Sequence, residues 1–97
     1  MRKIHEQPQR AEHLVEIVKA IAHPLRLRIC SALCEGDACV NDLAKLLGAR
    51  QATVSQQLRV MRMAGLVAAV RDGDGGRYTL AEPRLRALMD CLGSCVR

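Results

Sequence analysis

Two pairs of cysteines stand one helical turn apart in this chain of 97 residues, Cys30 with Cys34 and Cys91 with Cys95. At i, i+4 spacing on a helix, two thiolates can share one soft ion at about 2.3 Å, whereas their nearly parallel Cβ directions oppose a disulfide within the pair. The spacing therefore favours binding of a thiophilic ion, or a bond to a cysteine on another helix.

The two pairs differ in their surroundings. Free cysteine is often a small buried hydrophobe, and Cys30 and Cys34 on an apolar helix also fit that role. Cys91 and Cys95 stand at the edge of an apolar stripe beside Gly93–Ser94, where there is little core to fill and solvent can reach the sulfurs. We therefore expect the second pair to be functional, with a third thiol completing the site.

Three apolar helices are expected around these sulfurs. The first covers residues 9–22 and follows a loose arm at residues 1–8, the second covers residues 24–35, and the last begins at Pro83. The second should be buried on two sides, one with Leu25, Ile29, Ala32 and Leu33 and the other with Leu27, Cys30, Ser31 and Cys34. The first and last have more apolar surface than one small domain can use, which predicts a homodimer.

A helix-turn-helix is predicted between them. Residues 40–47 form a short amphipathic helix that Gly48 ends, and after a three-residue turn residues 51–65 form a second helix. Val54, Leu58 and Met61 share its inner face. The outer face has Gln, Thr, Ser and Arg side chains in place of the usual Glu and Lys, and these side chains can read base edges in a major groove.

The remaining residues predict a β-hairpin wing, and the composition limits which classes of protein and partner are possible. Two apolar runs, Leu66–Val70 and Tyr78–Leu80, flank a glycine-rich loop and indicate a β-hairpin. The net charge of +5 favours a polyanionic partner, and a single aromatic residue disfavours recognition by base stacking. The absence of an 18-residue apolar run or a secretory signal predicts a cytoplasmic protein without a membrane partner, in which thiols stay reduced.

The order of these elements resembles the ArsR/SmtB family of transcriptional repressors over nearly the whole chain. The matching segments are AIAHPLRLRI (20–29), DACVNDLAKLLG (37–48), QATVSQQLRVMRMAGLV (51–67) and the RYTL of the second wing strand. The resemblance implies a mainly α fold with a small β-hairpin, a winged helix-turn-helix domain at residues 9–97 that dimerises through its terminal helices. It also implies a repressor of double-stranded operator DNA that an effector releases, and not an enzyme.

Operator contacts follow from the resemblance and from the residue types together. The family's recognition pattern implies that Thr53, Ser55 and Gln56 contact the operator. Arg50 replaces the family's usual N-cap serine, which places a cation where the helix end faces phosphates. Two acidic residues at the wing tip, Asp72 and Asp74, make it a poor phosphate contact. We therefore expect Arg77, rather than the loop itself, to contact the DNA backbone. The predicted contacts are Arg50, Gln51, Thr53, Ser55, Gln56, Gln57, Arg59 and Arg77.

The family's known sensor sites are incomplete in this chain. Its arsenic-sensing members often have ELCVCDLC, where this chain has DACVNDLA and keeps only Cys39. The zinc-type site on the last helix needs histidine, and no histidine follows His23. The remaining candidates for a metal site are the pairs Cys30/Cys34 and Cys91/Cys95.

Three hypotheses follow for what the thiols do, and none needs a resident cofactor. The first is release by arsenite, antimonite or another soft metal ion at Cys91, Cys95 and a third thiol. The second is a redox or persulfide switch, since some relatives join a second-helix cysteine to a last-helix cysteine, although the second-helix position aligns with Ser31 here. The third, a thiol enzyme, lacks a CxxC motif and any cysteine–histidine pairing that the sequence can place.

Overall fold

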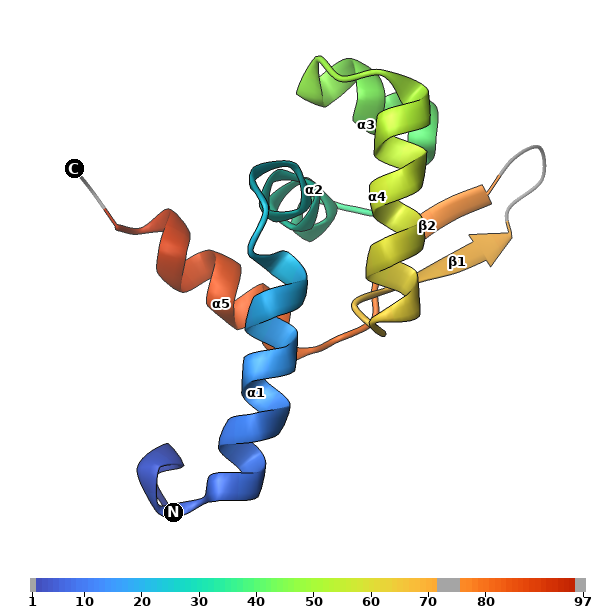
Figure 1. Cartoon of the computed structure of the whole chain (residues 1–97). Helices are drawn as coiled ribbons and strands as arrows, with labels where there is room; N and C mark the ends of the chain where they lie inside the picture. The colour runs from blue at the N-terminus through green and yellow to red at the C-terminus, as the bar shows by residue number, and fades with distance from the viewer. Residues whose placement is uncertain (1, 72–75, 96–97) are drawn as a thin grey trace.

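The computed structural model describes residues 2–71 and 76–95, and its elements alternate in the order expected of a winged helix-turn-helix (Figure 1). A 3-10 helix η1 (Ile4–Glu6) precedes α1 (Pro8–Ile21) and α2 (Pro24–Cys34). The helix-turn-helix is α3 (Val40–Leu47) and α4 (Gln51–Met63), and the wing is β1 (Val67–Arg71) and β2 (Gly76–Leu80). The last helix is α5 (Arg84–Gly93). Helix α2 packs against the other four α-helices and β2, so it is the centre of the fold.

Local signals set the helix ends. Pro24 begins α2, and the Nδ1 atom of His23 accepts a hydrogen bond from the Leu25 backbone N–H at 3.1 Å, which caps the helix. Gly48 adopts φ 65° and ψ 35°, a left-handed conformation that ends α3 without the steric cost of a Cβ. The predicted junction at residues 23–24 and the predicted glycine cap are both confirmed.

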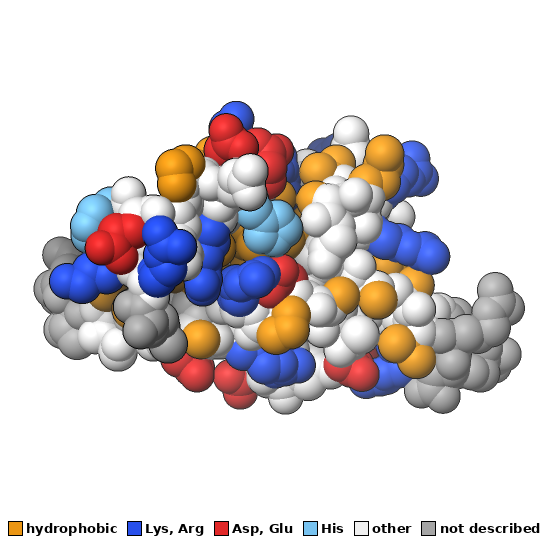
Figure 2. All heavy atoms as spheres, turned by 90° about the horizontal axis from the view of Figure 1, so that it is seen from below, with side chains coloured by type: hydrophobic (Ala, Val, Ile, Leu, Met, Phe, Trp, Pro, Cys, Tyr) orange, Lys and Arg blue, Asp and Glu red, His pale blue; other side chains and the backbone are white. Residues whose placement is uncertain are grey.

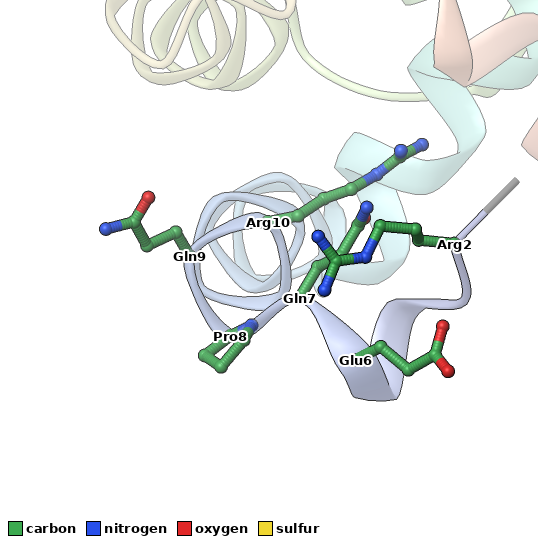
Figure 3. A pocket seen from close by; sticks show the side chains of 6 residues that line it. All are labelled: Arg2, Glu6, Gln7, Pro8, Gln9 and Arg10. Carbon is green, nitrogen blue, oxygen red and sulfur yellow. The ribbon is translucent and has the colours of Figure 1, made fainter.

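The N-terminal segment has more structure than the loose arm predicted for residues 1–8. The Lys3 backbone N–H donates to the Glu6 carboxylate at 2.9 Å within η1, and α1 begins at Pro8. Proline at this first position needs no hydrogen-bond partner for its nitrogen, which explains the earlier start. Figure 3 shows the Arg2 side chain reaching toward Gln7 beside an open hollow of about 670 Å³.

The core is formed by side chains from all five α-helices and from the start of the wing. Val54, Leu58 and Met61, the predicted inner stripe of α4, are fully buried, as are Ile29 and Leu33 of α2. Together they fix α4 with its polar face outward.

The second buried face predicted for α2 was wrong in part. Cys30 is fully buried, but Leu27 is 38% exposed and Ser31 is also exposed. These two residues line an open cavity of about 250 Å³, which Met89 and Leu92 of α5 border on its other side. A single copy of α5 does not cover this face, so the apolar surface of α2 is only partly used within the protomer.

The wing is an antiparallel hairpin in which Val67 pairs with Leu80 and Arg71 with Gly76. Ala38 joins it through two backbone hydrogen bonds with Tyr78, at 2.8 and 3.2 Å, which fastens the segment before α3 to β2. The predicted tip with Asp72 and Asp74 lies outside the described residues.

The described residues on the face of the molecule seen from below form no continuous basic patch (Figure 2). Figure 2 shows lysine and arginine side chains interspersed with acidic and apolar ones on the side seen from below. Among the described residues, no helix combines the length and apolarity needed to cross a bilayer.

Candidate nucleic-acid interface and cysteine sites

The outward face of α4 presents most of the predicted DNA-contact residues. Gln51, Thr53, Gln56 and Arg59 are exposed, while Ser55 is half-buried between this face and the core. None of these exposed residues is an acid, and the first turn of α4 has no acidic side chain. The helix therefore offers amide, hydroxyl and guanidinium groups on a rigid support, which are the groups that pair with base edges and phosphates.

Gln57 has a partner within the protein. The Arg26 side chain on α2 donates through Nε to Gln57 Oε1 at 2.9 Å and through Nη1 to the Ala20 carbonyl at 2.9 Å. This brace ties the end of α1 to α4, and it leaves the NH₂ group of Gln57 for a further contact. The sequence places Arg26 between two apolar faces of its helix and carries no local signal for these long-range partners.

Arg50 occupies the N-cap of α4 in extended conformation, with φ −73° and ψ 144°, and its side chain makes no capping hydrogen bond. A helix leaves its first backbone N–H groups without intrahelical partners, and these groups give this end partial positive charge. The cation at Arg50 adds to that charge. The arrangement is unfavourable in the free protein and favourable beside a phosphate.

Arg50→Ser is expected to stabilise the free protein and weaken DNA binding. Serine restores a cap worth about 1 kcal/mol, which raises Tm by roughly 4–8 °C in a domain of this size. Affinity should fall on every duplex alike, and the slope of log affinity against log salt should shrink by about one phosphate contact. Thermal melting and fluorescence anisotropy at several salt concentrations test both parts. An unchanged Tm with loss confined to the operator would show that Arg50 reads bases.

Arg77 lies on β2 and also bonds within the protein. Its Nη2 atom donates to the Asp37 carbonyl at 2.6 Å, and the side chain is half-buried. The bond joins the wing to the loop before α3. Any contact of Arg77 with DNA would therefore come from a side chain whose direction this bond already fixes.

The first cysteine pair is divided by burial. Cys30 is fully buried, and the pKa of its thiol is raised from 9.0 to about 11. Burial is the larger cause of this rise, and the neighbouring Cys34 thiolate is the smaller one. Because the thiolate is the form that binds metals and attacks disulfides, Cys30 is poorly suited to either reaction near neutral pH.

Cys34 is half-buried and lies against α5. Burial is the main cause that raises the pKa of its thiol. Arg86 lowers that pKa, and Asp90 and Glu35 raise it. The Arg86 guanidinium also donates to the Cys34 carbonyl at 3.3 Å, which fixes the end of α2 to α5. Of the two α2 thiols, Cys34 is thus the one in an environment shared with α5.

The second pair is exposed, as predicted. Cys91 lies on α5, but the helix ends at Gly93, so the prediction that one helix carries both sulfurs was wrong for Cys95. Cys95 follows the C-cap Ser94, and its thiol donates to the Cys91 carbonyl at 3.6 Å. Cys39 instead caps α3, with its sulfur accepting from the Asp42 N–H at 3.4 Å. Within residues 2–71 and 76–95 of one protomer, no three cysteine, histidine or acidic side chains gather as a metal site would require.

Comparison with known proteins places this geometry in a family. The family model for the arsR family of bacterial regulatory proteins matches residues 23–69, which span α2 to the start of the wing. The crystal structure of the transcriptional repressor BigR from Xylella fastidiosa has a TM-score of 0.89 and 31% identity, covering 99% of this chain and 100% of that one. The chain belongs to the ArsR/SmtB family.

Two further relatives extend this assignment. The HTH-type transcriptional regulator Rv0081 of Mycobacterium tuberculosis is 43% identical over 75 residues, which are 76% of this chain and 66% of that protein. The homodimeric winged helix-turn-helix domain of Mb0332 from Mycobacterium bovis has a TM-score of 0.77 and 25% identity, covering 95% of this chain and 84% of that one. The predicted family and the predicted winged fold are thus confirmed.

Proposed function

We propose that this ArsR/SmtB protein is a homodimeric repressor that binds operator DNA through α4 and is released by a thiol-reactive effector. The observation that carries the DNA-binding part is the acid-free polar face of α4, which the buried stripe of Val54, Leu58 and Met61 holds toward solvent. Two such helices in a dimer would read half-sites about 34 Å apart, or a multiple of that distance, on an imperfect palindrome.

Gln56→Ala tests the reading of bases. Gln56 is exposed near the middle of the polar face, so its amide can pair with adenine. The variant should lose about 1–3 kcal/mol of affinity for the operator and little for random duplex, since phosphate contacts stay in place. The matched control is Gln9→Ala on α1, where the same truncation should leave both affinities unchanged. Equal loss on both kinds of DNA would contradict base reading by Gln56.

The effector part of the proposal rests on two exposed cysteines, Cys91 on α5 and Cys95 just after the end of that helix. Their i, i+4 spacing suits two thiolate bonds to arsenite or antimonite, and such ions take a third thiolate. Cys34 is the better third ligand than Cys30, because it lies against α5 and is not fully buried. The third thiolate would come from Cys34 of the same subunit after a local shift, or from the second subunit.

A redox switch is the second candidate, and the position of Cys34 beside α5 supports it. Peroxide would take two electrons and two protons from Cys34 and one α5 thiol, forming a disulfide and two molecules of water. An organic persulfide could instead transfer its outer sulfur to one of the two thiols and leave as a thiol; attack by the second cysteine on that protein persulfide would then form the disulfide and release hydrogen sulfide. Both routes would connect α2 to α5. An enzymatic role is not proposed, since the family is one of regulatory proteins.

A further inference from the structure

We propose that Asn41 on α3 is a specificity-determining residue, which orients Gln51 of α4 as an adenine reader and itself contacts a DNA phosphate. The inference deepens the proposed DNA binding and rests on it. Gln51 Nε2 donates to Asn41 Oδ1 at 2.5 Å, and both side chains are otherwise exposed. This pair lies at the N-terminal ends of both helices of the helix-turn-helix.

The bond turns the Nε2 end of the Gln51 amide toward Asn41. A free glutamine amide can rotate by 180° and exchange its donor and acceptor ends at little cost. When a phosphate holds the Asn41 NH₂ group, Asn41 Oδ1 must face Gln51, so one N–H of Gln51 stays bonded and its other N–H and Oε1 atom keep a fixed order. That order of acceptor and donor is what bidentate pairing with the N6 and N7 atoms of adenine requires. Asn41 thus reduces the conformational freedom that Gln51 would otherwise lose on binding.

The same bond leaves Asn41 with only donors to offer. Its Oδ1 atom accepts from Gln51, while both N–H groups of Nδ2 remain for an acceptor outside the protein. The first helix of a helix-turn-helix crosses the DNA backbone, whose phosphate oxygens are acceptors. The Arg50 cation next to Gln51 and the uncapped start of α4 add positive potential in the same region.

Buried residues next to Asn41 and Gln51 hold the backbones of α3 and α4 in place and so keep the two amides close together. Leu43 of α3 and Val54 of α4, each a few residues from the pair, are buried in the core, with exposed fractions of 1% and 0%. The two amides are thus held at a fixed separation by packed helices, while neither contributes to the core. Substituting either one should leave the fold intact, which thermal melting checks.

The experiment is selection of binding sites from a random duplex library with the whole chain. Parent, Gln51→Ala, Asn41→Ala and Asn41→Asp are compared, with Gln9→Ala as the control for truncation of an exposed amide. Gln51→Ala should erase a preference for adenine at one position of each half-site. Asn41→Ala should weaken that same preference by about tenfold. Replacing that adenine by 7-deazaadenine, which lacks N7, should lower the DNA affinity of the parent but not that of Gln51→Ala.

Asn41→Asp separates the two roles of Asn41. Aspartate keeps an oxygen that accepts from Gln51, so the adenine preference should remain. It replaces the donors by a negative charge facing phosphate, so affinity should fall on all sequences. An unchanged site preference in Asn41→Ala would overturn the proposal, as would loss of the preference in Asn41→Asp. A parent that selects no duplex would overturn the proposed DNA binding as well, whereas the other two results leave it standing.

Discussion

Replacing Cys91 and Cys95 together by serine is expected to abolish release by arsenite or antimonite and to leave operator affinity within about threefold of the parent. Both sulfurs are exposed, Cys91 on α5 and Cys95 just after it, so the change removes no core contact. Helix α5 lies on the opposite side of α2 from α4 (Figure 1), so no DNA contact is lost either. An effector bound there would act by favouring a low-affinity arrangement of the subunits by several kcal/mol, which a set of thiolate bonds can supply.

Operator release followed by fluorescence anisotropy, with arsenite and separately with an organic persulfide, measures this effect. Cys39→Ser serves as the control, because Cys39 caps α3 and lies outside both pairs. Cys34→Ser should also impair release, whereas Cys30→Ala should retain it, since the buried Cys30 thiol remains protonated. Arsenite release that survives in the Cys91/Cys95 variant would rule out the metalloid site. Release of the parent by persulfide alone, with a crosslink between α2 and α5, would favour the redox switch.

The elements that the sequence predicts well are those that short-range patterns specify. The inner stripe of α4 recurs at helical spacing, so the side that faces the core follows from the sequence itself. Gly48 and Pro24 act on their own backbone conformation, and both mark helix ends where expected. The polar face of α4 then follows by geometry, because the core fixes which side points outward.

The contacts that the sequence could not reveal are those that join distant segments. The bonds from Arg26 to Gln57 and from Arg77 to Asp37 span 31 and 40 positions, and side-chain types alone do not select such partners. The difference in burial between Cys30 and Cys34 has a similar origin. Both residues lie on one side of α2, and the elements that pack around this helix, distant in the sequence, determine how far each sulfur is buried.

The exposed apolar face of α1 leads to the second large expected effect. Ile17 and Ile21 face the core with exposed fractions of 8% and 6%, whereas Val15 and Val18 are 46% and 55% exposed on another side of the same helix. Each exposed valine leaves apolar surface in water that a second subunit would remove. The sequence predicted this double-sided helix, and the structure confirms that the protomer covers one side only.

Val18→Glu is therefore expected to produce a folded monomer whose operator affinity falls by about 100-fold or more. A charge cannot be buried unpaired in an apolar interface without a cost of several kcal/mol. In a dimer, binding of one recognition helix holds the other near the second half-site at a high effective concentration. A monomer lacks this effect, and its loss accounts for the lower operator affinity. Analytical ultracentrifugation at micromolar concentration and anisotropy on the operator measure the two effects. Leu46→Glu on α3, where the leucine is 69% exposed, makes the same charge change and should remain dimeric. If Val18→Glu stays dimeric with parental affinity, the interface lies elsewhere, and an effector on α5 would need another route to the recognition helices.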